Sequence, residues 1–138
     1  MPRTQPEFRG PAPVAYVFRP EPASVGAARR FVAGWCEAAA FSDDVCDTAV
    51  LLTSEVVTNA FTHGRSEAHV TAACTPQGIH VAVTDGNSRY PEVVAADPDA
   101  LSGRGLTILA ALASRWGVQE ASFGKTVWFE LDVRSGGI

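Results

Sequence analysis

Three polar side chains recur every four residues along one predicted helix. Glu55, Asn59 and His63 stand at positions i, i+4 and i+8, so a helix of about 3.6 residues per turn places them in one row. A carboxylate, an amide oxygen and an imidazole in line can hold a water or hydroxyl, a metal ion and a phosphate, in that order. The same row can also be a solvated polar face, because the opposite side of this helix is apolar.

A second acidic residue, Asp85, stands at the end of a strand predicted over residues 79–85. Three apolar residues alternate along one face of this strand, and Asp85 has the same parity. A buried carboxylate is costly unless it is hydrogen-bonded, so Asp85 can accept a hydrogen bond from a ligand such as an exocyclic amine. Alternatively, the strand ends at Thr84, and Asp85 begins a turn with Gly86 and Asn87, which both tolerate left-handed backbone.

Two glycines precede a third predicted helix. Gly103 and Gly105 flank Arg104 directly before the helix, which begins at Leu106. Glycines at this place leave backbone N–H groups accessible, and the helix dipole favours negative charge there, so the turn can bind an anion such as phosphate. A plain capping turn would have the same sequence, and Arg104 would then contact solvent instead of phosphate.

The elements that must position these residues occur in groups. Ser24 and Ser42 are predicted N-caps of the first two helices, and Gly64 is the predicted stop of the second. This grouping of helices and hairpins favours an α+β fold, a two-layer sandwich. The predicted order is a strand at 15–18, helices at 24–40 and 42–63, strands at 68–74 and 79–85, a loop at 86–103, a helix at 106–114, and strands at 116–120 and 126–133.

Size and composition restrict the function classes. The 138 residues fit one domain, predicted over residues 14–134, with a proline-rich arm at 1–13 and a short tail at 135–138. Apolar residues make up 46%, and the net charge of −4 argues against direct binding of nucleic acid. No apolar run is long enough to span a membrane. The three cysteines form no CxxC pair, which indicates buried reduced thiols and a cytoplasmic location.

The order of these features resembles that of GHKL ATP-binding domains, which histidine kinases, gyrase and MutL proteins share. Four segments carry the resemblance over about residues 14–133. They are Ser54-Glu-Val-Val-Thr-Asn-Ala60 with His63-Gly64, Val83-Thr-Asp-Gly86, Gly103-Arg-Gly-Leu106 and Gly124-Lys-Thr-Val127. The chain is most similar to the short bacterial serine kinases that act as anti-sigma factors. The resemblance implies a mostly antiparallel sheet that is covered by helices on one face.

The resemblance also implies roles for the polar residues. Asn59 would bind Mg²⁺ that bridges the phosphates of ATP, Glu55 would be the general base, and His63 would contact the phosphate side. Asp85 would accept a hydrogen bond from the adenine amino group. The remaining nucleotide-binding positions would be Gly86, Asn87, Gly103, Arg104, Gly105, Leu106 and Thr126, where Asn87 replaces a glycine that is frequent in the family.

A chain of this size has no room for the second domain of larger family members, which leaves a stand-alone ATP-binding module. The implied function is that of a serine/threonine protein kinase that phosphorylates a small anti-sigma-factor antagonist and controls transcription by exchanging it for a sigma factor. A homodimer is also implied. Two other functions stay open, namely a non-catalytic protein-interaction module that binds ATP or no nucleotide, and a free-standing ATPase.

Overall fold

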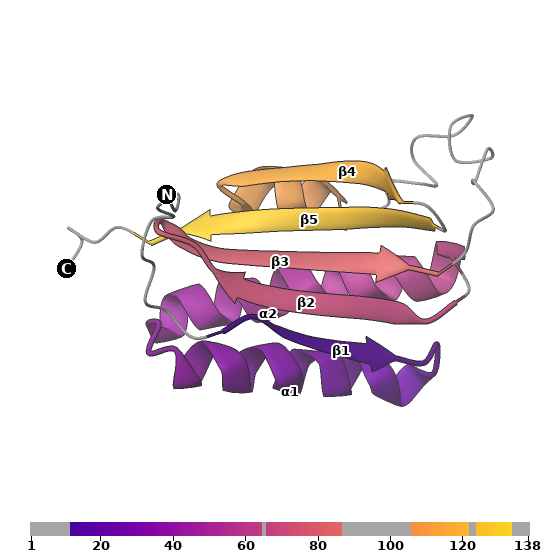
Figure 1. Cartoon of the computed structure of the whole chain (residues 1–138), viewed down its shortest axis with the longest axis horizontal. Coiled ribbons are helices and arrows are strands. Elements are labelled where there is room, and N and C mark those ends of the chain that lie inside the picture. Colours follow the sequence, from indigo (N-terminus) through magenta and orange to yellow (C-terminus); the bar gives the residue numbers. More distant parts are fainter. Residues whose placement is uncertain (1–11, 65, 87–105, 122–123, 134–138) are drawn as a thin grey trace, which may run out of the picture.

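A five-stranded sheet with helices on one face forms the body of the protein (Figure 1). The computed structural model describes residues 12–64, 66–86, 106–121 and 124–133. The elements are β1 (Val14–Phe18), α1 (Pro22–Ala38), α2 (Asp43–Asn59), η1 (Ala60–Gly64), β2 (Ala68–Cys74), β3 (Gly78–Asp85), β4 (Arg115–Ala121) and β5 (Gly124–Asp132). Residues 106–112 are also helical and lead into β4.

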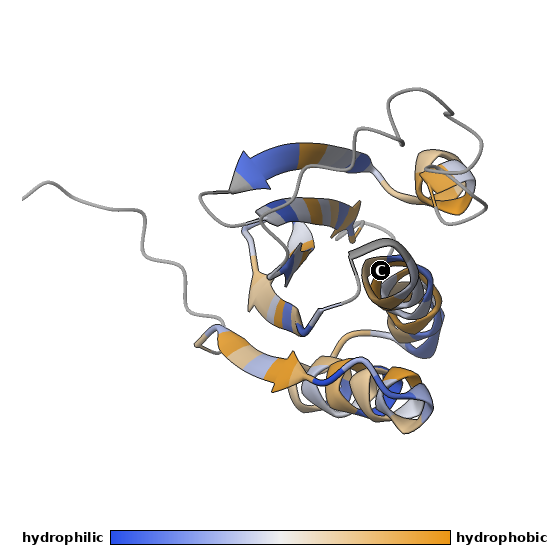
Figure 2. Ribbon diagram, turned by 90° about the vertical axis from the view of Figure 1, so that its right-hand side faces the viewer, coloured by the Kyte–Doolittle hydropathy of each residue, from blue (hydrophilic) through white to orange (hydrophobic). Residues whose placement is uncertain are grey.

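The strands lie in the order β1-β2-β3-β5-β4, and all four neighbouring pairs are antiparallel. Figure 2 shows the strands nearly end on, with the helices gathered on one side of them. The α+β fold and the antiparallel sheet covered on one face are therefore confirmed. The predicted order of strands and helices is confirmed as well, with each observed boundary within a few residues of the predicted one.

Alternation along the strands decides which side chains face the helices. In β3, Ile79, Val81 and Val83 are buried, whereas the residues between them are only partly buried. β5 repeats the pattern with Val127 and Phe129. These strand residues pack against the apolar stripes of α1 and α2 and form one core.

The first helix begins earlier than predicted. Its N-cap is Glu21 and its first residue is Pro22, so the prediction of Ser24 as the cap is wrong. Proline suits the first position of a helix because the N–H it lacks would have no partner inside the helix. The predicted apolar stripe is confirmed, since Ala28, Val32 and Trp35 are buried.

The second helix begins as predicted and ends differently. The hydroxyl of Ser42 accepts a hydrogen bond from the Val45 N–H at 3.3 Å, and two aspartates occupy the first turn, where the helix dipole favours anions. From Ala60 the helix continues as the π-helical segment η1, which includes Gly64. The prediction of one regular helix that Gly64 stops is therefore wrong, because Gly64 lies inside the wider π turn.

Several predictions fall on residues outside the described part of the chain. These are residues 1–11 of the predicted arm, almost all of the predicted loop at 86–103, residues 122–123 between the last two predicted strands, and the tail at 135–138. In the described part, no helix has the length and apolar character needed to cross a membrane.

Candidate functional site

The carboxylate of Asp85 ends strand β3 on the side of the sheet that the helices cover. Asp85 is still part of the strand and is buried, so the predicted parity is confirmed and a strand end at Thr84 is wrong. The next residue, Gly86, donates its backbone N–H to the hydroxyl of Ser66 at 2.9 Å. This bond ties the end of β3 to the segment that precedes β2.

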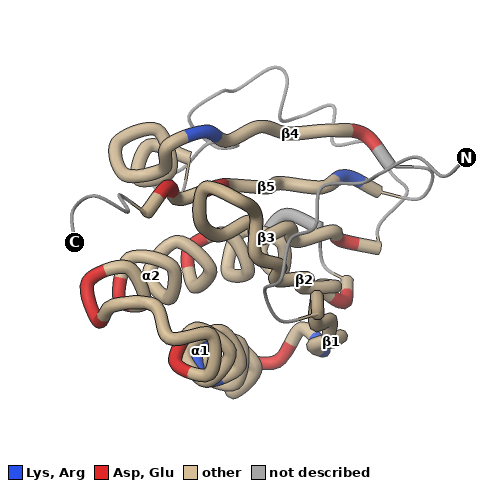
Figure 3. Tube along the Cα trace, turned by 60° about the vertical axis from the view of Figure 1, so that its left-hand side comes forward, with Lys and Arg blue, Asp and Glu red and all other residues tan. Residues whose placement is uncertain are grey.

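Residue 125 contacts both oxygens of this carboxylate. The ammonium nitrogen Nζ of Lys125 lies 3.2 Å from Oδ2 of Asp85, and the Lys125 backbone N–H donates to Oδ1 at 3.4 Å. The side chain of Asp85 is 5% exposed and that of Lys125 is 17% exposed, so the ion pair is largely withdrawn from water. Figure 3 shows the positive start of β5 and the negative end of β3 at the same end of the sheet.

This contact requires a glycine at position 124. A Cβ atom there would lie 2.1 Å from the Asp85 carbonyl oxygen and 2.7 Å from Oδ1. Real side chains do not approach so closely, and therefore only glycine lets the start of β5 come this near to the end of β3.

The structure does not bring Thr126 to Asp85. The hydroxyl of Thr126 lies 2.6 Å from that of Thr84, its register partner in β3. Both residues alternate with helix-facing neighbours, so they lie on the open face of the sheet, whereas Asp85 lies on the covered face. Lys125 is the β5 residue beside Asp85. The sequence showed that Lys125 alternates in phase with Val127 and Phe129, but it did not show that this strand pairs with β3.

The helix end that carries the predicted polar row lies at the same end of the sheet. Glu55 and Asn59 are partly buried and stand one turn apart on α2. Segment η1 follows directly and contacts β3. Figure 1 shows this helix end beside the tip of β3. The residues that act together in the prediction thus come from neighbouring ends of α2, β3 and β5.

The π turn separates His63 from the predicted row. Glu55 and Asn59 share a regular α-helix, but His63 belongs to η1, where hydrogen bonds run from i to i+5 and the turn is wider. The i, i+4, i+8 geometry is therefore confirmed for its first two members and does not extend to the third. The side chain of His63 lies outside the described part of the structure.

The predicted phosphate turn cannot be placed in the same way. Asn87, Gly103, Arg104 and Gly105 lie outside the described residues. Leu106, the first described residue after them, is partly buried and packs against the core. It begins the helical residues 106–112, which lie behind β4 in Figure 1.

A bound Mg²⁺ ion would find an oxygen ligand in Asn59. The amide oxygen of asparagine is a hard donor, and Mg²⁺ in proteins keeps most of its other positions for water and substrate phosphates. One protein ligand at a partly buried helix position therefore fits this ion. Among the described residues, no three His, Cys, Asp or Glu side chains come together as a metal-binding group.

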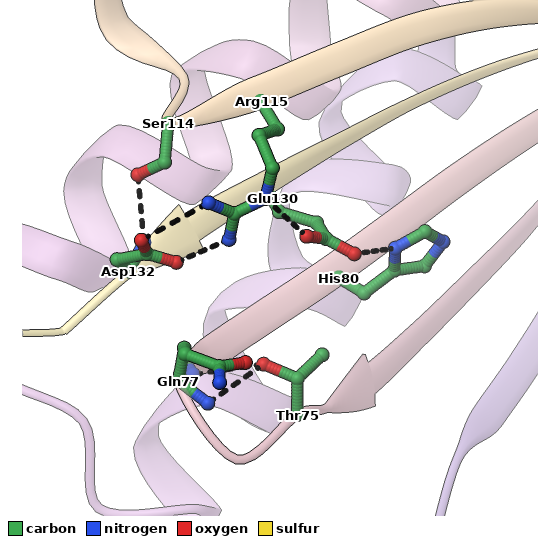
Figure 4. Close-up of polar contacts among 8 residues, drawn as sticks. Thr75, Gln77, His80, Ser114, Arg115, Glu130 and Asp132 are labelled. Atoms are coloured by element: carbon green, nitrogen blue, oxygen red, sulfur yellow. Dashed lines mark hydrogen bonds and ion pairs between the residues drawn. The ribbon is translucent and has the colours of Figure 1, made fainter.

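A second polar cluster lies on the open face of the sheet (Figure 4). Glu130 accepts hydrogen bonds from His80 at 2.8 Å and from Arg115 at 2.9 Å, and Arg115 also pairs with Asp132. Burial opposes ionisation of Glu130, but the bonds from His80 and Arg115 outweigh it and hold the pKa of this carboxyl below its ordinary value. The cluster joins β3, β4 and β5 on the face opposite Asp85.

Comparison with known proteins agrees with this arrangement. No curated protein matches the chain. Residues 18–131 match the family model of the histidine kinase-like ATPase domain, a range that includes both long helices, strands β2, β3 and β4, nearly all of β5 and every described residue of the candidate site. The chain therefore belongs to the histidine kinase-like ATPase domain family.

Proposed function

We propose that the chain binds ATP with Mg²⁺ and transfers the γ-phosphate to a serine or threonine of a partner protein. The observation that carries this proposal is the buried carboxylate of Asp85 on the helix-covered face, beside the end of α2 with Glu55 and Asn59. Membership of the family supports ATP as the ligand.

The carboxylate of Asp85 gives the site a reason to select adenine. Its oxygens accept hydrogen bonds, and the exocyclic amino group of adenine is a donor that guanine does not present at the same position. A buried acceptor that loses its partner is strongly disfavoured, and sites of this kind therefore discriminate well between bases. The carboxylate also stays in place, because it ends a strand in the middle of the sheet.

Asn59 and Glu55 act at the phosphate end. Asn59 would hold Mg²⁺, which neutralises charge on the phosphates when it is bound. Gly103, Arg104 and Gly105 would contribute phosphate contacts, a role that rests on their sequence. Because Glu55 stands one helical turn before Asn59, its carboxylate lies on the same side of α2 and can meet an acceptor hydroxyl.

The transfer itself needs one proton acceptor. The hydroxyl oxygen of the acceptor attacks the γ-phosphorus, the bond from that phosphorus to the β–γ bridging oxygen breaks, and ADP leaves. The carboxylate of Glu55 orients the hydroxyl and takes its proton. Water would have to be disfavoured as the acceptor. A docked partner protein can exclude water by occupying the space beside the Glu55 carboxylate.

The resemblance to anti-sigma-factor kinases suggests the partner. The acceptor would be a small antagonist protein with a phosphorylatable serine, and the same domain would otherwise hold a sigma factor. Phosphorylation would then decide which of the two proteins stays bound, and the domain could act as a homodimer. Because the net charge is −4, an effect on transcription would run through protein contact rather than through DNA.

Calorimetry with a non-hydrolysable ATP analogue, with and without Mg²⁺, tests the first half of the proposal. We expect binding that is tighter with Mg²⁺. The second half is tested by transfer of radiolabelled γ-phosphate to purified candidate antagonists, with ADP measured in the same reaction. Binding without any phosphoprotein would indicate an interaction module, and ADP release without phosphoprotein would indicate an ATPase.

Substitution of Glu55 tests its role in phosphate transfer directly. Glu55→Gln removes the proton acceptor and keeps the shape, so we expect retained ATP binding with transfer lowered by about 10²-fold or more. Glu37→Gln on the exposed surface of α1 makes the same chemical change away from the site and should transfer phosphate like the unmodified protein. Undiminished transfer by Glu55→Gln would remove Glu55 from its role.

A further inference from the structure

Position 125 holds the only lysine of the chain, and this lysine lies at the carboxylate that would receive adenine. Ten other cationic side chains of the sequence are arginines. Lys125 has the parity of Val127 and Phe129, so its side chain lies on the helix-covered face of the sheet. Its ammonium group therefore lies in the layer between sheet and helices, where a base bound to Asp85 would also have to lie.

Residue 125 donates hydrogen bonds to both carboxylate oxygens of Asp85, the acceptors that a bound base would need. Oδ1 receives the backbone N–H of residue 125, and Oδ2 receives the ammonium group. A charged donor forms a stronger hydrogen bond with a carboxylate than a neutral amine does. Because both partners are largely withdrawn from water, solvent weakens this pair less than it weakens the exposed ion pairs of the open face.

We propose that Lys125 competes with the adenine amino group for the carboxylate of Asp85 and thereby sets the affinity of the site for ATP. This inference rests on the proposed function, since it takes Asp85 as the acceptor for adenine. In the nucleotide-free protein the ion pair closes the adenine end of the site. Binding of ATP must break the ion pair. The apparent affinity for ATP is therefore the intrinsic affinity multiplied by the fraction of molecules in which the ion pair is open.

The Lys125→Met variant tests the competition. Methionine keeps an unbranched apolar stem and removes the ammonium group. We expect calorimetry to show ATP binding that is about tenfold tighter or more, whereas purine riboside triphosphate, which lacks the 6-amino group, should gain much less. Arg115→Met removes one positive charge from the opposite face of the sheet and should leave both affinities unchanged.

A measurement on the unmodified protein covers the case in which Lys125→Met does not fold. Selective ¹⁵N-lysine labelling gives a single side-chain signal, because the chain has one lysine. A paired, largely buried ammonium group exchanges its protons slowly and stays visible. Saturating ATP should shift this signal or remove it, and purine riboside triphosphate should leave it in place. An unchanged signal at saturating ATP would overturn the inference.

ATP binding by the unmodified protein and by Lys125→Met distinguishes an error in the proposed function from an error in the competition. If neither the unmodified protein nor Lys125→Met binds ATP, the proposed function itself is wrong. If both bind ATP and the variant binds with equal or lower affinity, the competition alone is wrong, and Lys125 serves to compensate the buried charge of Asp85.

Discussion

Gly124 lies so close to Asp85 that the backbone of Asp85 occupies the space that a side chain at position 124 would need. A Cβ at position 124 would meet the Asp85 carbonyl oxygen at 2.1 Å and Oδ1 at 2.7 Å. The two residues are almost forty positions apart in sequence, and the pairing of β3 with β5 brings them together. The glycine thus positions the buried carboxylate and the backbone N–H of the residue that follows.

Replacing this glycine should therefore disturb fold and site together. Gly124→Ala forces the start of β5 away from the end of β3, and overpacking of this kind costs about 1–3 kcal/mol, occasionally more. We expect a lower midpoint in chemical denaturation and weaker binding of ATP, because both contacts of residue 125 with Asp85 shift.

Gly34→Ala is the matched control for that substitution. Gly34 is exposed on α1, and a Cβ there would meet nothing within 4 Å. Alanine favours a helix over glycine by about 1 kcal/mol, so this variant should be more stable than the unmodified protein. Equal stability of the two variants would contradict the close contact between Gly124 and Asp85.

A double-mutant cycle should reveal strong coupling between Asp85 and Lys125. Asp85→Asn leaves a largely buried ammonium group without its counterion, and loss of one partner of a buried pair costs about 3–5 kcal/mol. The double variant Asp85→Asn/Lys125→Met should lose less stability than the sum of the single variants, as measured by urea denaturation. Additive losses would mean that the two side chains do not depend on each other.

The exposed pair of Arg115 and Asp132 provides the comparison for this cycle. Its side chains are 48% and 42% exposed, so water screens the interaction. The cycle of Arg115→Met with Asp132→Asn should give a smaller coupling free energy than the cycle at the buried pair.

Acidification should remove the contribution of Glu130 to stability. Bonds from His80 and Arg115 hold its pKa below the ordinary value of 4.5 in the folded protein. Its contribution is therefore fully present above pH 4.5 and is lost as the pH falls through the lower pKa of the folded state. Glu130→Gln should lower the free energy of unfolding by about 1 kcal/mol near neutral pH, with a smaller difference in acid.

Glu67→Gln is the control for the pH series. Glu67 is more than half exposed and lies 3.7 Å from His69, so its replacement should change stability little at any pH. A Glu130→Gln effect that stayed constant down to the acid transition would argue that the lost contribution is packing and not charge.

The three thiols should react in an order that burial decides. Burial raises the pKa of Cys36, Cys46 and Cys74 and so lowers their thiolate content at neutral pH. Cys36 and Cys46 are also inaccessible, whereas Cys74 is partly exposed. In the folded protein, a chromogenic disulfide reagent should label Cys74 slowly and the other two only on unfolding. Cys74→Ser should abolish the early reaction, and early labelling of Cys36 would contradict the packing of α1 against α2.

The amino-acid sequence by itself determined those features that depend on near neighbours. Alternation in residues 79–85 predicted that Asp85 faces the apolar side, and the spacing of Glu55 and Asn59 predicted that they share one side of α2. Each rests on a backbone period that a few consecutive residues establish. The order of the elements followed from such local patterns, and so did the α+β class of the fold.

Only the tertiary structure decided which distant residues meet. The sheet order places β3 beside β5, and this pairing brings Lys125 and Gly124 to Asp85 and turns Thr126 to the other face. The π-helical segment after Asn59, which contacts β3, likewise appeared only in the fold. Strand pairing and helix distortion depend on packing between segments far apart in the chain. Local periodicity therefore does not predict them.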